Sequence, residues 1–361
     1  MQTSTGFGKN AWQLWSITSR WAGWVSLIGA FMQKKSLLAA AALVLVSGAA
    51  MAQSSVTAFG LIDLAARNIK GADSVSYLSN EGRSTSRLGF RGVEDLGGGM
   101  KAGFWIETQV NPDDGSVGGN FWQRRATVSV MGAFGEVRLG RHKAATRTLM
   151  DDFDPFGTSG MPGLQTLLRL SDRNRSDNQV AYHLPAMGGV YGNFEVSAGE
   201  GANVAGTARS YAGRLGYRAG KLNVSGAYGQ YGSSNKAKIM AFGGSYNFGD
   251  FMLQGQYSET EVGTATHKIV NVGGSMKLGA AGKLVGTYAR AGGVSGAKAD
   301  LLGLGYDHSL SKRTTVYTTF ARMDNKDATG IQFNLGGATG GALSVRAGNS
   351  TGYEVGVRHT F

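Results

Sequence analysis

The residues best suited to acid–base or metal chemistry are five histidines, His142, His183, His267, His308 and His359. None of them belongs to a pair with metal-ligand spacing, and none stands near a recognisable nucleophile motif. The chain has no cysteine, which excludes disulfide scaffolds, thiol catalysis and thiolate metal sites. The sequence therefore predicts no enzyme active site, no metal site and no cofactor.

Charged side chains are the other groups that could act on a ligand. The formal net charge is +12. Residues 1–52 contribute four basic residues and no acidic one, so the remainder carries 32 basic and 24 acidic residues, a balance of +8. These charges stand singly along the chain, without a lysine or arginine run. The pattern argues against a nucleic-acid partner.

The charges lie on segments whose side chains alternate in polarity. At the C-terminus, Tyr353, Val355 and Val357 fall on one face of an extended strand, and Glu354 and Arg358 on the other. Apolar-out and polar-in alternation over about ten residues is the signature of a transmembrane β-barrel. We predict an all-β fold, a 16-stranded antiparallel barrel with strands at 54–67, 83–96, 100–111, 120–132, 135–144, 176–187, 190–200, 209–219, 221–231, 236–248, 250–261, 266–278, 282–293, 298–309, 313–324 and 350–361.

The connections between these segments are alternately short and long. Tight turns such as 97–99 and 188–189 alternate with longer polar connections, of which 145–175 and 325–349 are the longest. Strict alternation places all tight turns and both termini at one end of an up-and-down barrel. A barrel of about sixteen strands is too wide for side chains to fill, so its interior must hold water.

Residues 32–52 have the pattern of a secretory signal peptide. Two lysines precede an apolar core at 37–46, and Ala50-Met51-Ala52 supplies a small-x-small cleavage pattern. The core is too short to span a bilayer. We predict cleavage between Ala52 and Gln53.

This cleavage makes 53–361 the barrel domain. Residues 1–31 carry four tryptophans and no acidic residue ahead of a complete signal. We interpret them as an over-extended N-terminus, with an extended signal peptide as the alternative.

Five blocks of the mature chain resemble general porins of Gram-negative β-proteobacteria. They are SVTAFGLID (55–63), SRLGFRGVEDLGGGMKA (86–102), FGEVRLGR (134–141), SLSKRTTVY (309–317) and VRHTF (357–361). The resemblance implies an outer-membrane homotrimer in which each subunit is a water-filled pore. It implies contact with outer-membrane lipid and lipopolysaccharide, and recognition of the terminal Phe361 by the barrel-insertion machinery. It also implies that the third long loop, 145–175, folds inward and narrows the pore.

The same resemblance implies which residues line the narrowing. In anion-preferring members, an arginine cluster on the barrel wall faces acidic residues of the inserted loop. Carried over residue by residue, the cluster comprises Arg87, Arg124 and Arg175, with Glu107 beside them. Strand alternation separately predicts that Arg87 and Glu107 point inward. In the fourth strand, Arg124 and Arg125 would lie on opposite faces, and we assign Arg124 to the constriction and Arg125 to the aqueous rim.

The loop contributes three candidate acids to the constriction, Asp151, Asp152 and Asp154, of which we expect at least one to face the pore. Asp154-Pro155-Phe156-Gly157 stands where family members often have Pro-Glu-Phe-Gly-Gly. Arg91, Arg138 and Arg141 are interpreted as ordinary lumen or rim charges. The resulting hypothesis is passive transport of small anions and other hydrophilic solutes.

Two other functions remain as alternatives. A substrate-specific channel would show an aromatic track along the lumen, and Trp105 and Trp122 suggest aromatics without making a ladder. An outer-membrane barrel hydrolase would need a nucleophile, a base and an orienting group brought together, and no motif indicates them. A binding role for loop 325–349 would be an addition to the pore.

Overall fold

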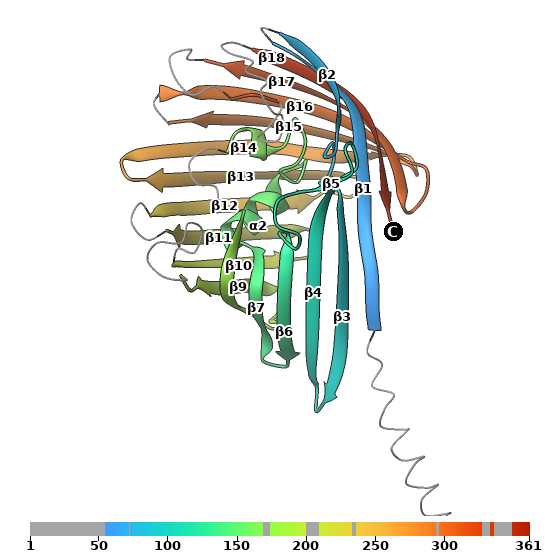
Figure 1. Cartoon of the computed structure of the whole chain (residues 1–361). Coiled ribbons are helices and arrows are strands. Elements are labelled where there is room, and N and C mark those ends of the chain that lie inside the picture. Colours follow the sequence, from blue (N-terminus) through green and yellow to red (C-terminus); the bar gives the residue numbers. More distant parts are fainter. Residues whose placement is uncertain are drawn as a thin grey trace, which may run out of the picture. The chain divides into compact units, whose positions relative to one another are not determined.

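The strands of this chain form one sheet that closes on itself. The computed structural model describes residues 55–71, 73–168, 174–199, 209–232, 236–293, 296–326, 333–335 and 349–361. Each long strand pairs antiparallel with the next, and β1 pairs with both β18 and β3, which completes the circle (Figure 1). The predicted 16-stranded antiparallel barrel is confirmed. The predicted N-terminal extension, signal peptide, cleavage site Ala52–Gln53 and most of loop 325–349 lie outside the described residues.

Sixteen strands in the described residues make the barrel wall. They are β1 (Ser55–Lys70), β3 (Arg87–Gly97), β4 (Met100–Asn111), β6 (Arg125–Gly132), β7 (Gly135–Lys143), β8 (Arg175–His183), β9 (Val190–Ser197), β10 (Ser210–Ala219), β11 (Leu222–Tyr231), β12 (Ala237–Asn247), β13 (Phe251–Val262), β14 (Ala265–Leu278), β15 (Gly282–Gly292), β16 (Lys298–Ser309), β17 (Thr314–Asn325) and β18 (Ser350–Thr360). Two short strands, β2 (Ser74–Ser79) and β5 (Ser116–Val117), belong to the connections and pair with the loop ends of β1 and β4.

The alternation of polarity sets which side chains face the interior. On β13, Gln254, Gln256 and Ser258 are buried inside the barrel, whereas Leu253 is exposed on the outer surface. On β18, Glu354 is buried and Val355 is exposed. Glutamine and glutamate are tolerated at these inward positions because they do not face the apolar outer surface. The wall is therefore apolar outside and polar inside.

Two strands begin at least four residues later than the sequence predicts. β3 starts at Arg87 instead of 83, because the carboxylate of Asp63 accepts the backbone N–H groups of Arg83 and Ser84 at 3.0 and 2.8 Å and holds that segment in a turn. β6 starts at Arg125 instead of 120, since the preceding residues form a turn in which Gln123 N–H donates to the Asn120 carbonyl at 3.0 Å. The second difference decides where two arginines lie.

The connection between β7 and β8 enters the barrel, as predicted for the third long loop. Within this inserted loop (residues 144–174) lie the helix α2 (Ala145–Phe153) and the short 3-10 turn η1 (Leu164–Thr166) (Figure 1). No helix in the described part of the chain is long and apolar enough to cross a membrane.

Helix α2 packs on the inner faces of β10, β11 and β12. Its buried side chains, among them Leu149 and Phe153, join a core with the small or branched residues Ala227, Ile239 and Ala241. At Gly243 a β-carbon would lie 2.3 Å from the Phe153 ring, so this wall position accepts the helix only as glycine. Apolar packing against a wall of small residues therefore holds the loop inside.

Candidate functional site

A cavity of about 790 Å³ lies inside the barrel beside the inserted loop. The described residues that line it include six arginines and one lysine but a single acidic side chain, Glu107. The basic residues are Arg87, Arg124, Arg125, Arg138, Lys143, Arg175 and Arg214. Such an excess of one sign in a water-filled passage creates a potential that attracts ions of the opposite sign.

Four of the predicted site residues meet in this cavity, and we call Arg87, Glu107, Arg124 and Arg175 the arginine cluster. Arg124 Nε donates to Glu107 Oε1 at 2.5 Å, and Arg87 Nε lies 3.9 Å from the same oxygen. Arg175 Nε donates to the backbone carbonyl of Arg124 at 2.7 Å. One carboxylate thus stands among three guanidinium groups and offsets only part of their mutual repulsion.

Neighbouring strands position the cluster. Arg87 begins β3, Glu107 lies on β4 and Arg175 begins β8. Arg124 precedes β6 and is fixed by its own backbone, because its N–H donates to the Glu107 carbonyl at 3.2 Å. The inward orientation predicted for Arg87 and Glu107 agrees with the cavity that both line.

The expectation for Arg125 is wrong. Strand alternation would put Arg124 and Arg125 on opposite faces, but Arg124 lies in a turn, where alternation does not apply. Both therefore line the cavity. Arg125 does not lie at the rim. It points toward the short-turn end, where its guanidinium lies 4.3 Å from the Trp105 ring centroid and its Nε donates to Thr127 Oγ1 at 3.0 Å.

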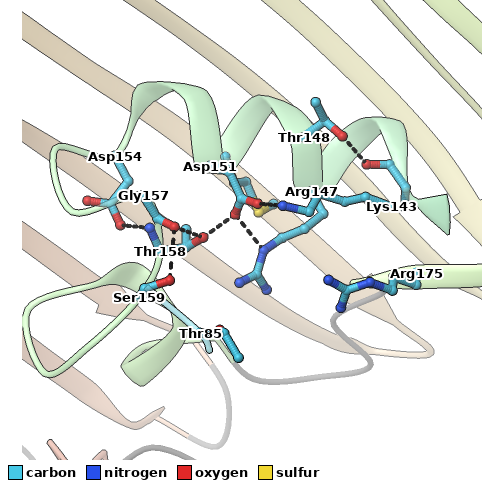
Figure 2. A network of polar contacts seen from close by, with 12 residues as sticks. Thr85, Lys143, Arg147, Thr148, Asp151, Asp154, Gly157, Thr158, Ser159 and Arg175 are labelled. Carbon is cyan, nitrogen blue, oxygen red and sulfur yellow. Dashed lines mark hydrogen bonds and ion pairs between the residues drawn. The ribbon is translucent and has the colours of Figure 1, made fainter. Parts of the chain in front are cut away.

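None of the three loop acids is among the described residues that line this cavity. Asp151 is held inside the loop by Lys143, by Arg147 at 2.8 Å and by the hydroxyl of Thr158 (Figure 2). Burial would raise the pKa of Asp151, but the nearby cations outweigh it and lower the pKa. Asp151 is therefore an ionised partner of basic residues, not a free acid at the neck.

Asp154 is also a structural residue. It is buried, and its carboxylate accepts the backbone N–H groups of Phe156, Thr158 and Leu164 at 3.0, 2.9 and 2.8 Å. Burial raises the pKa of Asp154 to about 6 despite these hydrogen bonds. The carboxylate closes the loop tip on itself, and placing it in the constriction was a wrong expectation.

Asp152 is the loop acid that reaches the barrel wall. Its carboxylate accepts a hydrogen bond of 2.6 Å from Arg214 Nη2 on β10, and its side chain remains 42% exposed. The loop acids in the described residues are thus compensated locally. Two of them and Glu136 pair with three basic residues of the cavity lining, in the pairs Lys143–Asp151, Arg214–Asp152 and Arg138–Glu136. Among the described residues, Arg125 and Arg175 of the lining have no carboxylate partner, so positive charge remains in excess.

Arg138, Lys143 and Arg214 line the cavity but were not predicted as site residues. For Arg214 a signal existed, because β10 alternates exposed Tyr211, Leu215 and Tyr217 with inward positions that include Arg214. Lys143 carried no such signal, since the ladder between β7 and β8 shifts register between Gly140 and His142.

Comparison with known proteins identifies the family. Residues 39–328 match the Gram-negative porin family. The chain is a Gram-negative porin. It is 38% identical to outer membrane porin protein 32 of Delftia acidovorans over 91% of this chain and 100% of the relative. It is 28% identical to an outer membrane porin protein of Bordetella pertussis over 82% of this chain and 98% of the relative.

Solved porin structures agree with the barrel. The anion-selective porin from Comamonas acidovorans superposes with a TM-score of 0.75 at 33% identity, covering 86% of this chain and 100% of that porin. A trimer form of OmpT from Vibrio cholerae has a TM-score of 0.63 at 17% identity, covering 85% and 99%, and shares the fold. This porin is therefore an outer-membrane channel and not an enzyme, as predicted from the sequence.

Proposed function

We propose that this porin is a homotrimeric general diffusion channel that prefers anions, and that the arginine cluster forms the electrostatic part of its constriction. The observation that carries the proposal is the cavity lining, in which seven basic side chains accompany one acidic side chain. The 33% identical porin from Comamonas acidovorans is described as anion-selective, which supports the same preference here.

The energetic argument rests on how the charges are compensated. Glu107 bonds Arg124 and stands near Arg87, so it holds two guanidinium groups together while leaving the cluster positive. Asp151 and Asp152 bind Arg147 and Arg214 instead of projecting freely across the water. Charges that are partly buried inside the barrel are screened by salt less than charges on the outer surface. Basic side chains still outnumber these acids, so the lining attracts a passing anion.

Single-channel conductance and reversal potential under a KCl gradient test this proposal. We expect openings in groups of three and a chloride preference. The double variant Arg87→Ala plus Arg124→Ala should lower the ratio of chloride to potassium permeability by roughly tenfold, which corresponds to about 1.4 kcal/mol of lost attraction. Arg322→Gln, which removes an exposed charge on β17, is the matched control. Cation preference of the unaltered porin would contradict the arginine mechanism while leaving the channel itself in place.

A substrate-specific channel is the second candidate because one observation favours it. Phe59 and Trp105 pack edge to face on the cavity wall with ring centroids 4.9 Å apart, so the lumen has an aromatic surface next to its arginines. Competition between solutes for conductance separates the two candidates, since a substrate-specific channel saturates with its own solute, whereas a general pore continues to conduct other small solutes.

We also propose how the porin reaches the outer membrane. Residues 32–52 direct export, and cleavage leaves Gln53 as the first residue, which the mass of the purified chain would reveal. Phe361 ends the chain beside β1, exchanging backbone hydrogen bonds of 3.1 Å with Gly60, and its ring is exposed. An exposed terminal aromatic suits recognition by the barrel-insertion machinery and contact with outer-membrane lipid or lipopolysaccharide.

A further inference from the structure

Two aromatic rings and two guanidinium groups form one assembly on the inner wall, here called the aromatic platform: Phe59, Arg91, Trp105 and Arg125. The guanidinium carbon of Arg125 lies 4.3 Å from the Trp105 ring centroid. That of Arg91 lies 5.1 Å from the Trp105 centroid and 5.2 Å from the Phe59 centroid. Both cations thus rest on the Trp105 ring, and Arg91 also lies against the Phe59 ring.

The cations of the aromatic platform have spare hydrogen-bond donors. Arg125 donates Nε to Thr127, and among the described residues its two terminal nitrogens donate to no protein acceptor. Among the same described residues, the Arg91 side chain makes neither an ion pair nor a hydrogen bond. Several other inner-wall arginines bind carboxylates, as in the pairs Arg67–Glu354, Arg138–Glu136 and Arg214–Asp152. The platform therefore differs from an ordinary network of lumen ion pairs.

The platform lies directly next to the constriction proposed above. Trp105 is two residues nearer than Glu107 to the short β3–β4 turn, and its indole N–H donates to Glu107 Oε2 at 3.2 Å. Phe59, Trp105 and Arg125 line the same cavity as the arginine cluster, and both rings are only partly buried. A solute leaving the cluster toward the short-turn end meets this surface next.

We propose that the aromatic platform is a binding subsite for small aromatic carboxylates of the benzoate class. The inference rests on the proposed anion-preferring pore and adds a preference among anions. It assigns the porin a weak solute specificity that charge alone would not produce.

The two halves of such a solute match the two kinds of group in the platform. A carboxylate takes a fork of two N–H donors from one guanidinium, a geometry that arginine supplies in its plane. The flat ring of the solute can lie on the outer face of the second guanidinium or on the exposed ring surface beside it. An aliphatic carboxylate satisfies only the first of these contacts. The shape and polarisability of the solute, besides its charge, therefore enter its affinity.

The test measures block of the open channel by three potassium salts: benzoate, cyclohexanecarboxylate and acetate. The first two are similar in size and charge and differ mainly in whether the ring is aromatic. We expect benzoate to halve the chloride current at a concentration about fivefold below that of cyclohexanecarboxylate, in keeping with a cation–π contact at a partly exposed site. Acetate should be the weakest.

Two variants connect that difference to the platform. Trp105→Leu and Arg125→Gln should each bring the two half-blocking concentrations to within about twofold of each other. Arg358→Gln is the matched control, because Arg358 points inward from β18 and stacks on no aromatic ring in the described residues. It should preserve the benzoate preference. Heat-modifiable migration on a gel confirms folding, and Arg91→Gln replaces any variant that does not fold.

Fluorescence supplies an independent readout. After residue 52 the chain has two tryptophans, Trp105 and Trp122, so Trp122→Phe leaves Trp105 as the reporter. Saturable quenching by 4-nitrobenzoate, absent with nitromethane at equal concentration, supports binding at the platform. Equal block by benzoate and cyclohexanecarboxylate, or a benzoate preference that survives Trp105→Leu, would overturn the inference. If the porin still prefers chloride in that case, only the subsite inference is wrong. If the unaltered porin shows no chloride preference, the proposed anion preference is wrong.

Discussion

Two regions of the same inner wall carry opposite kinds of side chain. On β3, β4 and β6 the wall presents Arg87, Glu107 and Arg125 to an open cavity. On β11 and β12 it presents Ala227, Ala241 and other small or branched residues, and helix α2 covers them. Charge remains where water remains, since burying an unpaired charge under the helix would be strongly unfavourable.

The difference shows that one loop makes the pore asymmetric. Short side chains on the covered wall let α2 approach closely, and Phe153 occupies the space above Gly243. Long side chains on the uncovered wall extend into the lumen and line the same cavity. Helix α2 contributes Thr148 to the lining of that cavity. The width of the neck thus depends on apolar packing, and its charge depends on the uncovered strands.

The largest effect is expected from removing the apolar anchor of the covered wall. Phe153 is fully buried, so Phe153→Ala should cost about 3–5 kcal/mol of loop docking. We expect larger single-channel conductance and faster proteolysis within 144–174. Phe320→Ala, on the outer face of β17, is the matched control. Unchanged conductance together with unchanged proteolysis would show that α2 is not held by this packing.

A second test uses pH to weaken the loop tip without altering the arginine cluster. The pKa of Asp154 is raised from 3.8 to about 6 in the folded loop, so the native state binds the proton more tightly than the undocked loop. The associated stability is fully present below pH 4 and is lost as pH rises through 6. The loss is on the order of 3 kcal/mol at most.

Hydrogen exchange of the Phe156, Thr158 and Leu164 amides, corrected for intrinsic rates, follows this equilibrium. Protection should fall between pH 4 and 6 and stay level above it. Asp154→Asn should remove the slope. Protection that increases over the same range would mean that the charged carboxylate, and not the protonated one, is favoured by the fold.

The smallest expected effect concerns an ion pair outside both regions. Arg322 binds Asp324 at 3.0 Å on the outer face of β17, with half of its side chain exposed. Exposed pairs contribute about 0–1 kcal/mol, so Arg322→Gln should change thermal stability little and the reversal potential not at all. A marked change in ion preference would show that rim charges, and not the cavity wall, set the selectivity.

The sequence was sufficient for the features that depend on local periodicity. Glu354 inside and Val355 outside follow from a two-residue repeat, and the same repeat predicted the inward orientation of Arg87 and Glu107. Glycines at 188 and 189 marked a tight turn, where both residues adopt positive φ. The sequence therefore predicted the sixteen strands, the direction of their faces and the position of the long third loop.

Only the tertiary structure decided the features that depend on where a strand repeat ends or on contacts between residues distant in the sequence. A turn at 118–124 brings both Arg124 and Arg125 to the cavity, and this turn has no periodic signal. No pattern in the sequence predicted the partners of Asp151, Asp152 and Asp154 either. A strand repeat reports which side of the sheet a residue faces, whereas the neighbour it meets across the lumen is set by barrel closure and loop packing.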